Sequence, residues 1–312
     1  MKRHRWMAPL RGFLAATTVV RQSLRRRERG IFPHELSVAA IFKNEARFLG
    51  EWLHFHDGVG VDHFFLYDDS SSDDFLAILD PWIAAGRVTL INGSGMNQIS
   101  AYNDCIRRFA EKSRWIAFID LDEFLFSPES RNLKQVLHRY QDLPAVFVYW
   151  VLYGSSGHVS RPDGYVIDSY TRCLDLKAAG TEQFDHGPPG KESYVTGWAR
   201  DGKSIVNPRR IVQMGAHIPR ILKSGEVLDE NRRPAKRHGD PRVITCDRLR
   251  INHYWSKSIE DLRDKVWKGD VFNRARPPRK LETWLRREAR LNVAHDETVR
   301  PIWTAIKKER GL

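Results

Sequence analysis

Short apolar runs alternate with amphipathic helical patterns along residues 37–119, and this alternation constrains the fold more than any other feature of the chain. The runs are short, apolar and followed by polar residues, which is typical of buried strands. Between them, apolar residues recur at helical spacing. The predicted strands are 37–42, 63–67, 87–91 and 115–119, and the predicted helices follow Asn44 and cover 73–85 and 97–112. Strands that alternate with helices need crossover connections, so we expect an α/β fold with a mainly parallel sheet covered on both faces.

The alternation weakens after Pro128. Apolar runs at 145–152 and 165–174 suggest further strands, and the Gly- and Pro-rich segment 181–191 suggests a loop. Residues 258–267 and 280–293 carry patterns of closing helices. We therefore expect mixed strands and loops here, followed by a helical C-terminal extension.

The net charge of +12 is concentrated in an N-terminal tail. Residues 1–30 contribute +8 and the remaining residues +4. The near balance of charge in residues 31–312 disfavours nucleic acid as a partner. The basic charge of the whole chain still leaves nucleic-acid binding as an alternative. The tail fits a solvated segment, a transit peptide, or a basic helix on an anionic membrane surface.

The tail and the cysteines also bear on location. The apolar stretch 12–20 is too short to span a bilayer, and Arg11 interrupts what would be a signal-peptide core. The three cysteines are scattered without CxxC spacing, which disfavours a disulfide framework. We expect a cytoplasmic protein, with peripheral contact at the inner face of a membrane as an option.

Asp120 and Asp122 directly follow the fourth predicted strand. In extended backbone, side chains two residues apart point to the same side, so the two carboxylates share one face. Paired carboxylates at the carboxyl edge of a sheet suit Mg²⁺ or Mn²⁺. An Asp-x-Asp pair arises by chance about once in a chain of this length. Its position at a strand end is what supports a metal site.

Other polar residues follow neighbouring strands or lie near the chain's later apolar segments. Asn44 is a predicted helix N-cap, and the Asp- and Ser-rich loop 68–73 is either a capped turn or a nucleotide-binding loop. The segment around His253 could supply an imidazole ligand together with a phosphate-neutralising Lys257. His217 is a weaker candidate. The remaining candidates for the nucleotide or sugar-diphosphate pocket are Lys43, Glu45, Asp69 and Asn103.

Five motifs follow one another along the chain: AIFKNE at 40–45, EWLxFH at 51–56, YDDSSSD at 67–73, FIDLDEF at 118–124 and INHYWSKS at 251–258. Taken in this order, they resemble glycosyltransferase families 2 and 92, whose members have the Rossmann-like GT-A fold. The resemblance implies that Asp122 coordinates the cation and that Asp120 reaches the ribose or the cation. It also implies that Asp69 reads the nucleobase and that His253 completes the metal site.

The resemblance further implies a division of the chain. The tail covers 1–34, the glycosyltransferase domain 35–255 and the helical extension 256–312. Within the domain, 35–127 is the expected nucleotide-binding half and 128–255 the acceptor-side half.

The implied reaction is inverting transfer from a nucleoside diphosphate sugar, such as a UDP-sugar, to a glycan, lipid-linked or other hydroxyl acceptor, as in polysaccharide biosynthesis. An inverting transfer needs a carboxylate base, for which Glu182 and Asp185 are the candidates and Glu123 the second choice. A nucleotidyltransferase is a rival interpretation, but it would need a Gly-rich phosphate loop after the first strand. A degenerate domain that only binds is a further rival, disfavoured by the intact Asp pair.

Overall fold

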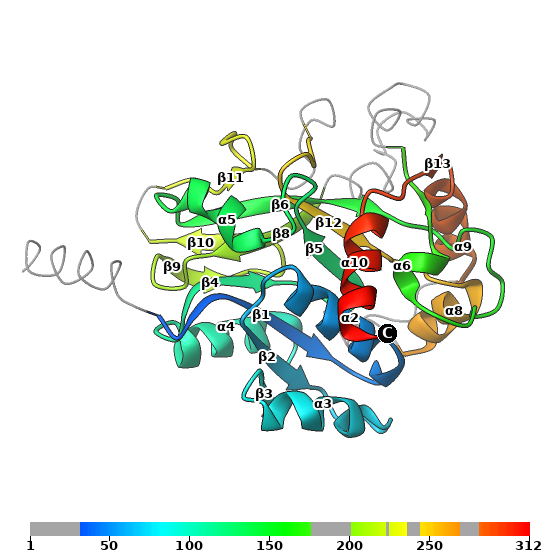
Figure 1. Cartoon of the computed structure of the whole chain (residues 1–312), viewed down its shortest axis with the longest axis horizontal. Helices are drawn as coiled ribbons and strands as arrows, with labels where there is room; N and C mark the ends of the chain where they lie inside the picture. The colour runs from blue at the N-terminus through cyan, green and yellow to red at the C-terminus, as the bar shows by residue number, and fades with distance from the viewer. Residues whose placement is uncertain (1–31, 176–200, 223–224, 236–243, 269–280) are drawn as a thin grey trace, which may run out of the picture. The chain divides into compact units, whose positions relative to one another are not determined.

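The computed structural model describes residues 32–175, 201–222, 225–235, 244–268 and 281–312. Residues His34–Leu312 form one compact unit, and Met1–Pro33 are assigned to another. A nine-stranded sheet lies at the centre of the unit His34–Leu312 (Figure 1).

Four parallel strands form one half of this sheet, in the order β3-β2-β1-β4. Helices α2 to α4 connect them, as the alternating sequence pattern predicts. The elements in chain order are β1 His34–Phe42, α2 Ala46–Gly58, β2 His63–Asp68, α3 Phe75–Ala84, β3 Val88–Asn92, α4 Gln98–Phe109 and β4 Ser113–Phe118. The carboxyl ends of these strands share one edge, so the loops that follow β1, β2 and β4 meet there.

The other half of the sheet mixes directions. Strand β8 (Gly202–Val206) lies antiparallel between β4 and β6 (Ala145–Leu152). Strand β12 (Arg250–His253) runs parallel to β6 and antiparallel to β5 (Glu123–Phe126). The short β11 (Leu228–Asp229) adds a further parallel pairing to β6. Within this sheet, five pairings between described strands are parallel and three are antiparallel, and the predicted α/β fold class is confirmed.

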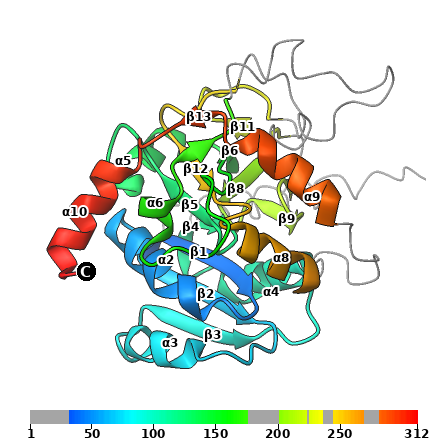
Figure 2. The same cartoon turned by 90° about the vertical axis from the view of Figure 1, so that its right-hand side faces the viewer.

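Helices cover both faces of the sheet because the side chains of each strand alternate. In β1, Val38 and Ala40 join the larger core cluster, whereas Ala39 joins the smaller one on the opposite face. The larger cluster contains the buried face of α2, including Trp52. The smaller cluster contains Tyr102 of α4. Figure 2 shows α2 and α4 on opposite sides of the strands.

The C-terminal elements pack against the same core. Helices α8 (Ile259–Lys268) and α9 (Leu281–Glu288) occupy the two predicted helical segments. A further helix, α10 (Arg300–Arg310), lies in the predicted helical extension 256–312, where no separate helix was predicted at this position, and it buries Trp303 and Ile306 against α2. Its first turn carries a proline, where the missing N–H costs no hydrogen bond.

The strand predicted at 165–174 is wrong in large part. The segment forms a single helical turn, α6 (Val166–Ser169), followed by the two-residue strand β7 (Arg172–Cys173). The buried carboxylate of Glu51 accepts hydrogen bonds from the backbone N–H groups of Val166 and Ile167, at 2.7 and 2.9 Å. A side chain distant in sequence thus fixes a helical start that the local apolar pattern does not indicate.

Short elements complete the described chain: α5 Leu133–Leu137, η1 His138–Tyr140, β9 Ile211–Met214, β10 Pro219–Ile221, η5 Ala289–Leu291 and β13 Ala294–His295. Within the described ranges, every helix falls short of the length and apolar character needed to cross a membrane. The proposed division of 35–312 into halves and an extension stays a prediction.

Candidate metal and donor site

The segment between β4 and β5 meets the end of β12 at one edge of the sheet. In the β5–β12 ladder, Glu123 pairs with His253. The backbone N–H of Tyr254 donates to the carbonyl oxygen of Asp122 at 2.8 Å, which extends this contact by one residue. Trp52 of α2 donates its indole N–H to the carbonyl oxygen of Glu123 at 2.9 Å. The backbone therefore brings Asp122, Glu123 and His253 together.

These three side chains form a cluster that could hold a metal ion. One ligand atom from each lies within 4.8 Å of the others. The Nε2 atom of His253 is 3.5 Å from Asp122 Oδ1, and its Nδ1 atom is 3.8 Å from Glu123 Oε1. Glu123 is fully buried, yet its Oε1 atom makes no hydrogen bond in the described structure. Buried carboxylates normally have partners, so this oxygen fits a divalent cation bound by one nitrogen and two carboxylates.

The electrostatics of Asp122 and His253, but not of Glu123, favour the protonation states that metal ligands need. Burial raises the pKa of Asp122, but Lys265 and His253 outweigh it and hold the pKa well below its usual value. Burial lowers the pKa of His253, which favours the neutral imidazole. Burial raises the pKa of Glu123 well above its usual value, and Lys203 offsets only part of that rise. A bound dication would favour the ionised form of Glu123.

Asp120 faces a different set of partners. Its Oδ2 atom accepts a hydrogen bond from the ammonium of Lys203 at 2.8 Å. Its Oδ1 atom accepts from the hydroxyl of Tyr102 at 3.0 Å and from the amide of Gln98. Burial raises the pKa of Asp120, but Lys203 outweighs it and lowers the pKa below the usual value. The predicted pair is therefore divided, with Asp122 in the cluster with Glu123 and His253 and Asp120 in a hydrogen-bonded network.

The loops after β1 and β2 interlock at the same edge. The side-chain carbonyl of Asn44 accepts a hydrogen bond from the backbone N–H of Ser72 at 2.7 Å. The prediction that Asn44 caps α2 is wrong, because its φ is 54° and the N-cap position is Glu45. The carboxylate of Asp73 instead accepts from the first helical N–H, that of Ala46, at 2.7 Å. The left-handed backbone at Asn44 turns its side chain towards the second loop.

The remaining candidates around these loops differ in exposure. Asp69 is buried beside the end of β1, where its backbone N–H donates to the carbonyl of Phe42 at 2.8 Å. Lys43 is exposed. The ammonium of Lys257 lies 3.9 Å from the carboxylate of Glu45 and 4.0 Å from the centre of the Phe48 ring. The structure thus joins the end of β12 to the first loop, as a shared donor site requires.

Two further candidates are engaged within the protein. The amide of Asn103 donates to the carbonyls of Ile99 and Met214, and its oxygen accepts from the backbone N–H of Met214. The Nδ1 atom of His217 lies 2.8 Å from the carbonyl oxygen of Gly202.

The ring of Trp150 contacts both His217 and His253, with ring centroids 5.4 and 4.5 Å apart. His217 therefore borders the metal cluster through an indole ring. The predicted bases Glu182 and Asp185 lie outside the described residues.

Sequence reasoning missed Gln98, Lys203 and Lys265. Lys265 donates to Asp122 Oδ2 at 2.7 Å and to the carbonyl of Trp255 at 3.0 Å. It lies on α8, where a surface lysine is unremarkable in sequence. Lys203 carried no indication in the sequence either, because only Ile205 and Val206 are large apolar residues in the strand Gly202–Val206.

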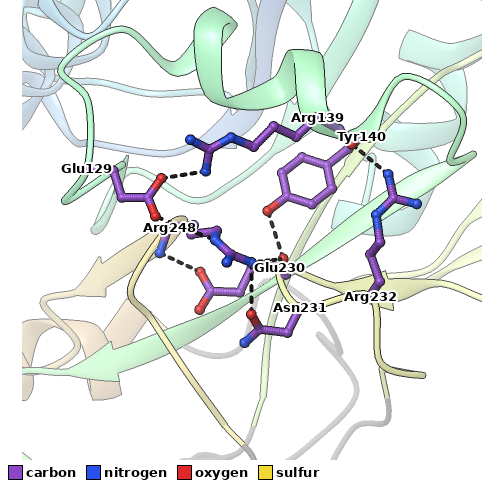
Figure 3. Close-up of a pocket in the computed structure, with 7 residues that line it drawn as sticks. All are labelled: Glu129, Arg139, Tyr140, Glu230, Asn231, Arg232 and Arg248. Carbon is purple, nitrogen blue, oxygen red and sulfur yellow. Dashed lines mark hydrogen bonds and ion pairs between the residues drawn. The ribbon is translucent and has the colours of Figure 1, made fainter.

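A separate cavity of about 510 Å³ lies beside the start of β12 (Figure 3). Arg139 and Arg248 both form ion pairs with Glu129, at 2.5 and 3.4 Å. The carboxylate of Glu230 accepts backbone hydrogen bonds from residues 247–249. These contacts fix the chain that enters β12, at the end opposite His253, and we do not place the candidate site there.

Comparisons with known proteins give matches to glycosyltransferases. The model of glycosyltransferase family 92 matches residues 33–288. A family 92 protein of Oryza sativa subsp. japonica is 32% identical over 143 residues, which cover 44% of this chain and 24% of that protein. The galactan β-1,4-galactosyltransferase GALS2 of Arabidopsis thaliana is 28% identical over 187 residues, which cover 57% of this chain and 32% of that protein. The matches to the first three relatives thus cover about a quarter or less of those proteins.

Among solved structures, the chain is similar to S. aureus TarS in complex with UDP. The TM-score is 0.34 at 11% identity, and the match covers 56% of this chain and 47% of that one.

Proposed function

Because this chain belongs to glycosyltransferase family 92, we propose that it transfers a sugar from a nucleoside diphosphate sugar to a hydroxyl acceptor. The observation that carries the proposal is the cluster of Asp122, Glu123 and His253 at the carboxyl edge of the parallel strands. Ligands of open α/β sheets bind outside this edge. The interlocked loops after β1 and β2 border the same edge and would receive the nucleoside.

Asp122, Glu123 and His253 would hold Mn²⁺ or Mg²⁺. When bound, the cation would stabilise negative charge on the departing diphosphate. Lys257 and Lys265 add fixed positive charge, since both lower the pKa of Asp122. A preorganised positive edge of this kind favours the charge that develops as the sugar–phosphate bond breaks.

The name of one relative supplies a donor sugar and an acceptor to test first. GALS2 is named as a galactan β-1,4-galactosyltransferase, so UDP-galactose and a β-galactan are the first donor and acceptor to test. A β product from an α-linked donor requires inversion, and hence a base on the face opposite the diphosphate. Glu182 and Asp185 remain our candidates for this base. Asp120 and Asp69 are the proposed contacts to the ribose and the nucleobase.

The proposal is tested by thermal unfolding in the presence of UDP-, GDP- and dTDP-sugars, each with and without Mn²⁺. We expect a UDP-sugar to raise the melting temperature, and to do so more strongly with Mn²⁺, because ligands that bind the native state stabilise it. If no nucleotide produces a metal-dependent rise, the donor-binding proposal fails.

Asp122→Asn should abolish the Mn²⁺ dependence of both stabilisation and turnover while the protein stays folded. The change removes one anionic ligand, and loss of metal-assisted charge stabilisation should lower kcat by roughly 100-fold or more. Turnover is measured with UDP-galactose across a Mn²⁺ titration. Asp142→Asn is the matched control, because Asp142 lies at the surface and pairs with Arg232. Unchanged Mn²⁺ dependence in Asp122→Asn would contradict the assigned metal role.

A further inference from the structure

Lys203 is a buried cation for which the reaction proposed above has no assigned use. It lies in β8 between β4 and β6, paired with Val148, and is 1% exposed. A charged lysine is almost never fully buried unless it is paired, because removing its ammonium from water is costly. A buried ammonium at this position therefore needs negatively charged partners, and these partners lie in the candidate site.

The ammonium of Lys203 lies between two carboxylates. It is 2.8 Å from Asp120 Oδ2 and 3.9 Å from Glu123 Oε1. A further N–H donates to the carbonyl oxygen of Ala216 at 3.5 Å. The side chain is thus fixed from three directions, and its charge is shared by Asp120 and by one of the three metal-cluster residues.

The contacts of Asp120 leave it little capacity for a metal. A carboxylate has about four acceptor positions. Gln98 and Tyr102 occupy two of them on Oδ1, and Lys203 occupies a third on Oδ2. One position remains, enough for a single hydroxyl donor.

We propose that Lys203 is a positioning residue that acts as an internal monovalent cation, separating Asp120 from the metal cluster so that the site takes one divalent ion. The inference rests on the proposed function, because it assumes that Asp122, Glu123 and His253 bind that ion. It assigns Lys203 two tasks. It holds Asp120 towards the donor, and it keeps a second dication out of the space between Asp120 and Glu123.

The test counts Mn²⁺ bound to the full chain by electron paramagnetic resonance and calorimetry, with Mn²⁺ alone as the probe. The wild type should bind one Mn²⁺ per chain. Lys203→Met removes the charge and frees Asp120, so this variant should bind a second Mn²⁺ or bind the first on the order of tenfold more tightly. Lys203→Arg retains the charge and should behave as the wild type.

Two outcomes separate this inference from the proposed function. If the wild type binds no Mn²⁺, the metal site fails and the inference fails with it. If the wild type binds one Mn²⁺ and a folded Lys203→Met variant binds one with unchanged affinity, the inference alone is overturned.

A double variant covers the case in which Lys203→Met does not fold. Lys203→Met combined with Asp120→Asn removes both members of the pair, and we expect it to fold and bind one Mn²⁺ with the wild-type Kd. Loss of Mn²⁺ binding in the folded double variant would identify Asp120 as a metal ligand and overturn the inference.

Discussion

His56 shows how a single residue of the candidate-site region can be fixed by its backbone contacts. Its Nδ1–H donates to the carbonyl oxygen of Trp52 at 2.8 Å, and its Nε2 accepts from the backbone N–H of Leu125 at 3.1 Å. Both contacts are satisfied by one neutral tautomer. Burial lowers the pKa of His56 to about 3, only partly offset by the contact with Trp52. The neutral imidazole links α2 to β5, the strand that follows Asp122.

His56 should make the protein less stable in acid. Between pH 3 and 6.5 the unfolded state binds a proton at this position and the folded state does not, so stability rises with pH across this window. At pH 5 the lowered pKa of His56 reduces the free energy of unfolding by about 2 kcal/mol. In the wild type, this group should make the free energy of unfolding about 2 kcal/mol higher at pH 7 than at pH 5. When the free energy of unfolding of His56→Gln is measured at the same two pH values, this part of the difference should be absent.

The matched control is His295→Gln, since the side chain of His295 is 58% exposed. Its pH dependence should equal that of the wild type. If His56→Gln also shows the pH dependence of the wild type, the acid response comes from other groups.

At the residue scale, the resemblance pairs Asp122 with His253 at one site, and the structure places their side chains 3.5 Å apart. Their role as metal ligands stays a prediction. Lys203 was missed because its role depends on β8 entering the sheet beside β4, a pairing between segments about 90 residues apart that local pattern does not encode. Lys265 was missed because only the placement of α8 brings its ammonium to Asp122.

At the scale of elements, the contact between α2 and α10 depends on a glycine. A Cβ atom added at Gly58 would lie 2.5 Å from Cδ1 of Ile306, which is fully buried. At Gly50, in the same helix, the nearest atom would be the Cγ2 of Ile78 at 3.8 Å, an ordinary contact. The two glycines therefore differ in packing while sharing a helix.

Gly58→Ala should destabilise the protein by about 1–3 kcal/mol, because Ile306 must move and α10 with it. Gly50→Ala should instead stabilise by up to about 1 kcal/mol, because alanine favours the helix. Both values come from denaturant unfolding. Equal effects of the two substitutions would contradict the close packing of α10 on α2.

Helices and strands were likewise predicted where their own sequence pattern determines them, and were missed where distant residues do. The strands and helices of 34–118 were predicted because each carries its own apolar period. The segment 165–174 was misassigned because Glu51, distant in sequence, organises its turn. The bounds of α10 within the predicted helical extension were missed although Trp303 and Ile306 lie on one face, since its other positions are largely polar and charged.

At the scale of the molecule, the net charge is concentrated in one part of the chain. Residues 1–30 carry +8 of the +12 net charge, and the two core clusters formed by the described residues lie within 34–312. Association with anionic surfaces should therefore depend on the tail, and folding should not.

A variant of residues 32–312 should unfold cooperatively at the wild-type melting temperature, because it retains both core clusters. It should lose salt-sensitive binding to phosphatidylserine vesicles, since that attraction scales with basic charge near the surface. Vesicle co-sedimentation at low and high salt, with phosphatidylcholine vesicles as the control, checks this. Salt-dependent binding of DNA or RNA by the shortened chain would instead revive the nucleic-acid alternative.

The β5–β12 ladder also has a consequence for the order in which the molecule becomes competent. Asp122 and His253 are about 130 residues apart in sequence, so an ion that bridged them would close a very long loop. Such a cross-link can form only after the intervening strands have docked. Metal binding would then indicate that folding is complete. Removal of the metal would loosen the chain where β5 and β12 pair.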